Sequence, residues 1–432
     1  MKNTLLKRLM LAGLAAAFLI PASFVALQFL HDPGSNTPAV AVTDASQQVR
    51  QGQYLAQAGS CMGCHTSRGG PAYAGGRRIE TPFGALYSPN ITPDAASGIG
   101  KWNADDFWRA LHNGKSRDGH FLYPAFPYTA YTRMPRADSD ALYAYFKSLA
   151  PVSQPNRAHA LRFPYDQRPL LAVWRALYFT PGEFVPDPRR SVQWNRGAYL
   201  VQGPGHCSAC HAARNALGAS EQGISLGGGL MPAQGWYAPS LTADSEAGLG
   251  TWTEAQIGEL LKTGVTTQAS VFGPMAEVVA QSLQHLNNSD VAAMANYLKS
   301  LPPTATERAG RETPREAVDE AVLTRGAKLY GDHCSSCHQD DGRGAAPAYP
   351  PLAGNRAITM ASAINPIRIV LNGGFAPGTA GNPRPYGMPP YGPSLSDAEV
   401  AAVVTYIRNQ WGNQAAAVSA QDVGRNRAVP ID

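Results

Sequence analysis

The same pattern of hydrophobic and polar positions occurs three times along the chain. Each copy opens with a segment in which a glycine, a tyrosine and a leucine recur: Gly52, Tyr54 and Leu55; Gly197, Tyr199 and Leu200; Gly326, Leu329 and Tyr330. Each copy closes with an amphipathic segment of helical period: Asp138 to Leu149, Asp290 to Leu301 and Ser396 to Trp411. The pattern predicts three similar domains, each bounded by an N-terminal and a C-terminal helix.

The closing segments share an acidic residue seven positions before a tyrosine: Asp138 and Tyr145, Asp290 and Tyr297, Glu399 and Tyr406. An acid in the first turn complements the helix dipole, and Ser289 and Ser396 are plausible N-caps. We expect the tyrosines to face the core. The first two copies also share a Gly-X-Gly block before a tryptophan, Trp102 or Trp252, that opens another helix.

The N-terminus carries a different pattern. Lys2, Lys7 and Arg8 precede an apolar run from Leu9 to Leu30 that only Ser23 and Gln28 interrupt with polar side chains. A secretory signal needs an apolar core of about 7 to 15 residues, and a spanning helix needs about 20. The run is long enough for a cleaved signal or for a retained anchor, and either one places the rest of the chain outside the cytoplasm, on the periplasmic side of the membrane.

Proline-rich joints set the expected domain boundaries. We expect a signal or anchor segment and linker (1–45), domain 1 (46–150), a connection (151–186), domain 2 (187–303), a linker (304–317), domain 3 (318–413) and a polar tail (414–432). The connection contains an apolar helical stripe: Leu170, Leu171, Trp174, Leu177 and Tyr178. The stripe fits packing between domains, and it also fits a contact with a membrane or a partner.

Composition narrows the class of protein. The 432 residues include 43 Gly and 35 Pro with only 16% charged residues, which favours loop-rich domains with short helices. The formal charge of +5 is small for this length, and no basic run alternates with aromatic residues, so a nucleic acid is not the expected partner. With 44% hydrophobic residues and one long apolar run, the chain is neither disordered nor a polytopic membrane protein. The expected fold is mainly α.

All six cysteines fall into three Cys-X-X-Cys pairs, and a histidine follows each pair at once. The three motifs are Cys61, Cys64 and His65; Cys207, Cys210 and His211; Cys334, Cys337 and His338. This is the attachment signature of c-type haem. Two thiols on one helical turn can bind the two vinyl groups of one porphyrin, and the adjacent imidazole can then ligate the iron. The sequence therefore predicts three covalently bound haems c.

Zinc binding, disulfides and redox-active dithiols account less well for three Cys-X-X-Cys-His motifs. Structural zinc would join two pairs, which leaves the third pair unmatched and gives the adjacent histidines no role. Disulfides within each pair would close only very short loops. Redox-active dithiols normally follow a strand in a βαβ unit, and no such rhythm surrounds these pairs.

A haem that only carries electrons needs a second axial ligand, and methionine is the usual choice because its thioether raises the potential. Met388 precedes the last closing helix on a proline-stiffened loop, and Met275 precedes the second. Met134 is the corresponding expectation for the first domain, with His112 or His120 as alternatives.

The motifs together resemble a known family, the three-haem cytochrome c subunits of membrane-bound periplasmic dehydrogenases, such as those acting on gluconate, on sugars and polyols, or on alcohols with a quinone cofactor. The resemblance covers residues 46 to 413. Besides the haem motifs it rests on residues 123–128 (YPAFPY), 168–171 (RPLL), 194–199 (WNRGAY), 235–239 (GWYAP) and 406–413 (YIRNQWGN). Some relatives place a methionine where this chain has Phe126.

The resemblance implies an electron-transfer subunit. Such a subunit takes electrons from a catalytic subunit of flavin, PQQ or molybdenum type and delivers them to membrane quinone or another respiratory acceptor. It implies partners at the membrane surface and no catalysis by the chain alone. The alternative functions are a free-standing multihaem electron carrier or a haem peroxidase, and a peroxidase would need an iron with an open sixth position.

Overall fold

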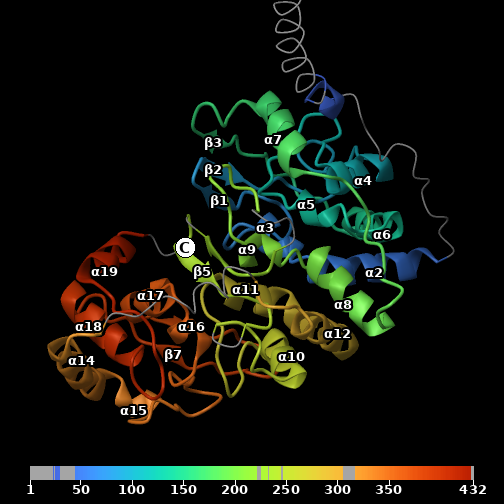
Figure 1. The fold of residues 1–432 in the computed structure, drawn as a ribbon. Coiled ribbons are helices and arrows are strands. Elements are labelled where there is room, and N and C mark those ends of the chain that lie inside the picture. The colour runs from blue at the N-terminus through green and yellow to red at the C-terminus, as the bar shows by residue number, and fades with distance from the viewer. Residues whose placement is uncertain are drawn as a thin grey trace, which may run out of the picture.

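The computed structural model describes residues 23, 25–29, 44–220, 225–231, 233–244, 247–304 and 317–429. This part of the chain is mainly helical, and its strands form one three-stranded sheet and two two-stranded sheets (Figure 1). The structure confirms the mainly α fold that the sequence predicts.

The first repeat begins with a long helix and ends with one. Its elements are α2 (Ala45–Ala58), α3 (Cys61–His65), β1 (Arg78–Thr81), β2 (Gly84–Tyr87), α4 (Ala104–Asn113), α5 (Tyr128–Tyr131) and α6 (Arg136–Ser148). The connection adds β3 (Ala160–Leu161), a 3₁₀ turn (Arg168–Leu170) and α7 (Leu171–Tyr178). Strand β3 extends the antiparallel hairpin of β1 and β2, with Gly84 opposite Leu161, so the connection folds back on the first repeat.

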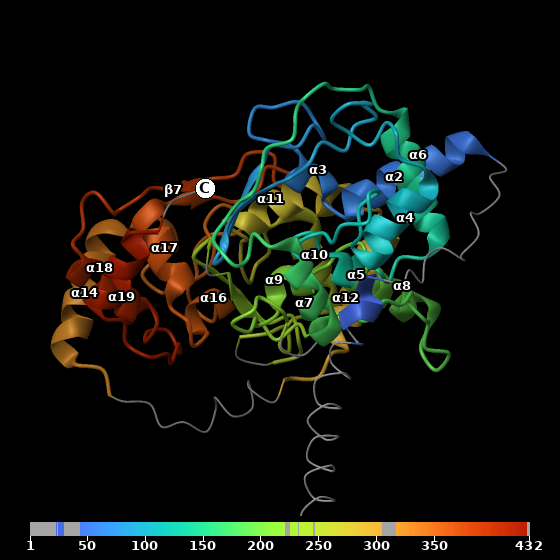
Figure 2. The same ribbon diagram turned by 90° about the horizontal axis from the view of Figure 1, so that it is seen from above.

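The other two repeats follow the same plan. The second contains α8 (Val192–Gln202), α9 (Ser208–His211), β4 (Gly229–Met231), β5 (Trp236–Ala238), α10 (Glu254–Thr263), α11 (Pro274–Gln281), a 3₁₀ turn (Leu283–His285) and α12 (Asn288–Lys299). The third contains α14 (Glu320–His333), α15 (Ser335–His338), α16 (Arg356–Thr359), α17 (Ile364–Asn372), β6 (Gly374–Phe375), β7 (Gly387–Met388) and α18 (Asp397–Ile407), and α19 (Ala420–Arg427) follows it. In Figures 1 and 2 the second repeat lies between the other two.

The repeated glycine marks where the first and last helices of each repeat cross. A Cβ atom on Gly52 or Gly197 would lie 1.9 Å from the carbonyl oxygen of Ala141 or Ala293, and one on Gly326 would lie 2.4 Å from that of Ala402. No side chain fits at these distances, so glycine allows the two backbones to approach closely. The sequence pattern therefore records one helix crossing made three times.

The ends of the closing helices differ in part from the sequence expectation. Helix α18 begins as predicted, because Ser396 and Glu399 form a capping box. Ser289 is not a cap: Asn287 is the N-cap of α12, and its side chain accepts a hydrogen bond from the Asp290 amide at 2.7 Å. An asparagine caps a helix as well as a serine does, so helix α12 starts earlier than expected. Of the three tyrosines, Tyr297 is fully buried, and Tyr145 and Tyr406 are half-buried.

The three repeats contain two hydrophobic cores rather than three. One hydrophobic cluster runs through the first and second repeats and joins Leu55 and Phe146 to Leu200 and Leu298. A separate cluster fills the third repeat, around Val400. The first two repeats therefore share one core, whereas the third repeat has its own.

Both ends of the chain extend beyond the repeats. Helix α19 lies in the polar tail, yet Val423 is fully buried against the third repeat, and Arg427 pairs with Asp397 at 2.8 Å. The apolar run from Leu9 to Leu30 lies mostly outside the described residues. Within the part that is described, no helix has the length and apolar character needed to cross a membrane.

Candidate haem sites

Each Cys-X-X-Cys-His motif forms a single helical turn after the first helix of its repeat. Helix α2 ends at Gly59, and Ser60, with φ of 48°, turns the chain into α3. In the other two motifs the amide of the second cysteine donates to the carbonyl of the first at 3.2 Å, from Cys210 to Cys207 and from Cys337 to Cys334. The turn brings the two thiols and the imidazole of each motif close together, which is the arrangement that haem attachment requires.

The three motif histidines are oriented in the same way. In each motif, Nδ1 of the histidine lies close to a proline carbonyl oxygen. The distances are 2.8 Å from His65 to Pro89, 2.7 Å from His211 to Pro239 and 3.0 Å from His338 to Pro350. A carbonyl only accepts, so Nδ1 carries the proton and Nε2 keeps its lone pair for a metal. Burial also lowers the pKa of all three, that of His211 to about 4, which keeps the imidazoles neutral.

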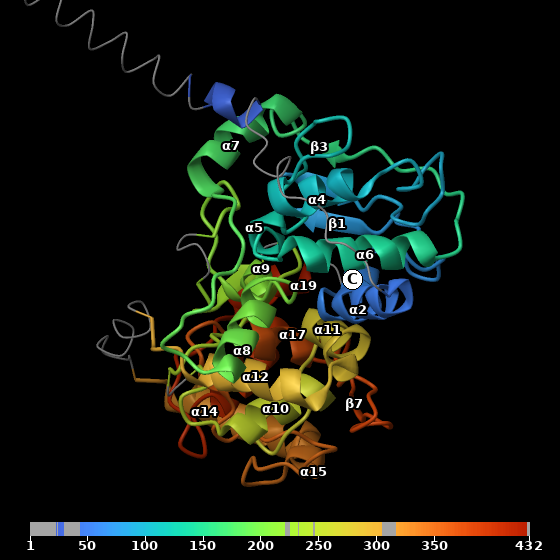
Figure 3. The same ribbon diagram turned by 90° about the vertical axis from the view of Figure 1, so that its right-hand side faces the viewer.

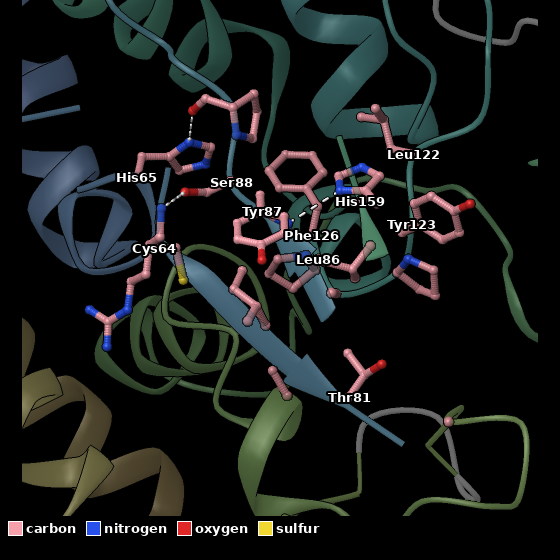
Figure 4. A pocket seen from close by; sticks show the side chains of 18 of the residues that line it. Cys64, His65, Thr81, Leu86, Tyr87, Ser88, Leu122, Tyr123, Phe126 and His159 are labelled. Carbon is pink, nitrogen blue, oxygen red and sulfur yellow. Dashed lines mark hydrogen bonds between the residues drawn. The ribbon is translucent and has the colours of Figure 1, made fainter. Parts of the chain in front are cut away.

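A large apolar cavity opens over the first motif (Figure 4). Its volume of about 2010 Å³ exceeds the roughly 300 to 1,000 Å³ of an ordinary small-molecule site. Apolar side chains such as Ile99, Leu142 and Phe146 line it beside Cys61, Cys64 and His65. The cavity also reaches Cys210 of the second motif. The residues fit a porphyrin: two thiols, a neutral imidazole and apolar walls.

The thiols themselves are unpaired, and the first cysteine of each motif is partly buried, whereas Cys64 and Cys210 are exposed. None of the six cysteines forms a disulfide, and burial raises the pKa of Cys61 and Cys207 to about 12 and that of Cys334 to about 11. These values indicate an environment that keeps the free thiols protonated rather than activating them as thiolates.

The three methionines expected to ligate iron lie on different elements of their repeats. Met275 is the second residue of α11 and packs partly buried against the core shared by the first two repeats. Met388 ends β7, opposite Gly374, and packs against the core of the third repeat. Met134 is 1% exposed, lines the cavity with His65, and directly precedes Pro135, the N-cap of α6.

The alternative histidines differ in position. His112 lies on α4, stacks on Trp108 at 4.3 Å between ring centroids, and is not among the described residues that line the cavity. His120 lines the cavity and pairs with Asp118 at 2.5 Å. Sequence reasoning missed His159, which also lines the cavity, and the three prolines whose carbonyls orient the motif histidines. Prolines that follow a motif by 12 to 28 residues carry no signal of their own.

The first two repeats meet at reciprocal contacts. Tyr54 of the first repeat donates a hydrogen bond to Asp290 of the second at 2.6 Å, and Tyr199 of the second donates to Asp138 of the first. The same two positions of the repeat thus contact each other in both directions. Asp138 and Asp290 were expected only to complement the helix dipole, and they also hold the two repeats together. The third repeat has Lys328 at the tyrosine position and makes no such pair among the described residues.

The Tyr54–Asp290 and Tyr199–Asp138 contacts differ because a different residue precedes the repeated glycine in each repeat. Arg196 donates to both oxygens of Asp290, at 2.8 and 2.7 Å, whereas Gln51 is the equivalent residue beside Asp138. Burial raises the pKa of Asp138 above its ordinary value, despite its hydrogen bonds to Tyr199 and Gln51. Burial acts in the same direction on Asp290, but hydrogen bonds from Arg196 and Tyr54 lower its pKa overall.

We expect Arg196→Gln to lower the free energy of unfolding at pH 7 by about 1 to 2 kcal/mol, allowing for the partial exposure of the arginine. A carboxyl whose pKa is lowered by folding stabilises the protein above its unfolded pKa, and that stability is lost as the pH falls through the folded pKa. The difference between the variant and the wild type should therefore shrink below pH 3.8. Urea unfolding across this range measures it. Arg50→Gln, on the exposed side of α2, is the control, and an equal loss in both variants would contradict the assignment.

A further ion pair lies between the first two motifs. Arg77, just before β1, donates to Glu277 of α11 at 2.7 Å and also to the carbonyl of Gly63 inside the first motif. Glu277 follows Met275 by two residues on the same helix. This pair fixes the methionine-bearing helix of the second repeat against the attachment turn of the first.

The third repeat contacts the second near its haem motif. Asn365 and Tyr237 exchange two hydrogen bonds, at 3.0 and 2.8 Å. Arg356 donates to the Ser240 carbonyl at 2.9 Å and lies over the ring of Trp252. Ser240 directly follows Pro239, whose carbonyl orients His211. The second motif therefore lies close to both neighbouring repeats.

Comparison with known proteins agrees with this geometry. The family model described as cytochrome c matches residues 49–150, 195–302 and 323–411. The cytochrome c subunit of the quinone-type alcohol dehydrogenase of Gluconacetobacter polyoxogenes is 39% identical over 88% of this chain and 84% of its own length. That of gluconate 2-dehydrogenase from Pantoea cypripedii is 39% identical over 88% and 89%. The cytochrome subunit of fructose dehydrogenase from Gluconobacter japonicus is 36% identical over 92% and 85%. The chain belongs to the cytochrome c family, among the cytochrome c subunits of dehydrogenase complexes.

Proposed function

We propose that the chain binds three covalent haems and relays electrons from a catalytic dehydrogenase subunit to a membrane quinone or another respiratory acceptor, on the periplasmic side of the membrane. The observation that carries the proposal is the threefold recurrence of one site: a Cys-X-X-Cys-His turn whose histidine binds a proline carbonyl through Nδ1. The relatives support the partner, because they are subunits of alcohol, gluconate and fructose dehydrogenases.

The chain's own residues suit a relay. When bound, haem supplies one-electron exchange at iron, and its potential depends on axial ligands, burial and hydrogen bonds. The paired cysteines would attach each porphyrin, and His65, His211 and His338 would each present Nε2 to an iron. Met275 and Met388 would supply thioether ligands in the second and third repeats. The apolar walls exclude water, which limits the reorganisation that accompanies each change of charge.

Reconstitution tests this function. The purified holoprotein, mixed with its catalytic partner and that partner's substrate, should show haem reduction, and a quinone analogue should then reoxidise the haems. The substrate alone should reduce nothing, because the chain is expected to lack a catalytic centre. Reduction by substrate without the partner would contradict the proposal, and so would a partner complex whose haems stay oxidised.

An exposed apolar surface supports a membrane contact. Helix α7 buries Ala172 and Arg175, but Leu170 before it and Val173 and Leu177 on it are exposed, at 50%, 45% and 63%, and all three border the cavity over the first motif. The apolar stripe seen in the sequence is thus only partly used in packing. Residues 25–29 of the apolar N-terminal run lie beside α7 (Figures 1 and 3). The ring of Phe29 packs against that of Phe121 in the first repeat, with 4.9 Å between the ring centroids. Because this run is the expected signal or anchor, we propose that α7 faces the bilayer.

Replacing Val173 and Leu177 together by aspartate should therefore reduce the binding of the holoprotein to phospholipid vesicles by at least about tenfold, since burying two apolar side chains contributes about 1.5 to 3 kcal/mol each. Vesicle co-sedimentation measures the loss. Val192→Asp is the matched control, because Val192 is 88% exposed but lies on α8. Equal binding by all three proteins would rule out α7 as the membrane contact.

A further inference from the structure

The position of Met134 within its repeat differs from those of the other two expected ligands. The residue directly before the N-cap of the closing helix is Met134 in the first repeat, Leu286 in the second and Leu395 in the third. All three are buried, at 1%, 1% and 9% exposure. Two of these equivalent residues are leucines, which cannot ligate a metal. The position is therefore one of apolar packing, at which methionine serves as well as leucine.

The loop that carries the other methionines has a counterpart in the first repeat. Met275 lies 12 residues before its N-cap, Asn287, and Met388 lies 8 residues before Ser396. Counting 12 and 8 back from Pro135 gives residues 123 to 127, Tyr-Pro-Ala-Phe-Pro. This stretch contains no methionine, histidine or cysteine. Two of its side chains line the cavity with their aromatic rings: Tyr123, which lies under the Arg168 guanidinium at 4.9 Å from the ring centroid, and Phe126, an aromatic hydrocarbon that cannot ligate iron.

Phe126 faces the haem cavity of the first repeat. It lines the same cavity as His65 and packs against Tyr131 at 5.3 Å between ring centroids. In Figure 4, His65 lies at one side of the cavity and Phe126 lies farther in, near Tyr87 and His159. The side chain at the place of a sixth ligand is thus apolar.

The nearby histidines lie outside this loop and each makes a contact of its own. His112 stacks on Trp108 and contacts Thr132, and His120 pairs with Asp118. His159 accepts a hydrogen bond from the Tyr87 amide at 3.2 Å. His206 contacts the Pro204 carbonyl at 2.8 Å, within its own turn before the second motif. All four contacts are made through Nδ1, and none of the four histidines lies in the stretch 123–127 that corresponds to the methionine-bearing loops of the other repeats.

We propose that the first repeat holds its haem with the sixth position open and covered by Phe126, as a binding site for small neutral ligands of ferrous iron. In this assignment Met134 packs beside the haem without binding its iron, which replaces the ligand expected from the sequence. The inference rests on the proposed haem attachment and adds a ligand-binding site to the relay. An apolar cover such as Phe126 favours an uncharged diatomic molecule over an anion, because it offers no hydrogen-bond donor.

Carbon monoxide is the probe. Titrating the dithionite-reduced holoprotein should convert about one third of its haem absorbance to the carbon monoxide form. Phe126→Met should abolish the binding by supplying a thioether from the same loop position as in the other repeats. Met134→Leu should leave the bound fraction unchanged, because a leucine already occupies the equivalent place in the second and third repeats.

Two controls make the result decisive. Met275→Leu should raise the carbon monoxide-binding fraction from about one third to about two thirds, which shows that the assay detects a lost ligand. The haem content of each variant, measured after denaturation, separates an absent haem from a ligated one. A wild type with three haems that binds no carbon monoxide overturns the inference and leaves the relay intact. Binding that appears only in Met134→Leu overturns it equally, by identifying Met134 as the ligand.

Discussion

Replacing Cys207 and Cys210 together by alanine should remove one haem and interrupt the relay. The denatured variant should retain two thirds of the wild-type haem absorbance and lose the mass of one haem. The second repeat lies between the other two and contacts both, through Tyr54 and Asp290 on one side and Asn365 and Tyr237 on the other. Loss of its haem should therefore interrupt electron transfer between the first and third haems more than loss of either terminal haem would interrupt the relay.

The expected functional result is a partner complex that reduces part of the remaining haem with substrate but no longer passes electrons to a quinone analogue. Stopped-flow absorbance follows both steps. The matched variant Cys334→Ala with Cys337→Ala removes a terminal site instead, so it should leave electron exchange between the haems of the first and second repeats intact. If either pair could be replaced without loss of haem, the attachment motifs would have been wrongly assigned.

Met388→Leu should lower the reduction potential of the third haem by on the order of 0.1 V, because axial ligands set haem potentials over a range of about 0.8 V. A thioether favours the ferrous state, and leucine has no lone pair to replace it. Met388 lies at the end of β7, partly buried against the core of the third repeat, so the similar volume of leucine should preserve the fold.

A spectroelectrochemical titration of the holoprotein resolves this change. Met360→Leu is the control, because Met360 lies in the same repeat and is 4% exposed but lies at the end of α16 rather than on the loop before α18. The control should keep all potentials within error of the wild type. Equal potentials in the wild type and in Met388→Leu would exclude Met388 as an axial ligand.

The motifs predict haem attachment because that chemistry is local. Five consecutive residues hold both thiols and the imidazole, and the spacing alone predicts three sites. The recurrence of Gly52, Gly197 and Gly326 at one place in each repeat was also visible in the sequence, whereas the helix crossing at which they lie was not. Both features depend on residues that are close in sequence or that repeat at a fixed position.

Contacts between repeats could not be predicted in this way. Tyr54 and Asp290 are 236 residues apart, and nothing in either segment indicates the other. The shared core of the first two repeats could not be predicted for a similar reason. Periodicity shows which face of a helix is apolar but not which other element covers that face. The sixth ligand of the first haem stays a prediction. Counting back from a closing helix selected Met134, but the equivalence of Met134 with Leu286 and Leu395 emerged only when the N-caps were located.

The haem content of the chain tests the central claim most directly. The holoprotein, matured with its own export signal and then denatured, should give a pyridine haemochrome absorbance equal to three haems per chain, and its mass should exceed that of the polypeptide by three haems. Covalent attachment through Cys61 and Cys64, Cys207 and Cys210, and Cys334 and Cys337 predicts that acid and organic solvent remove none of this haem. A fully matured chain that carries two haems or fewer, or that releases haem on extraction, would contradict the account.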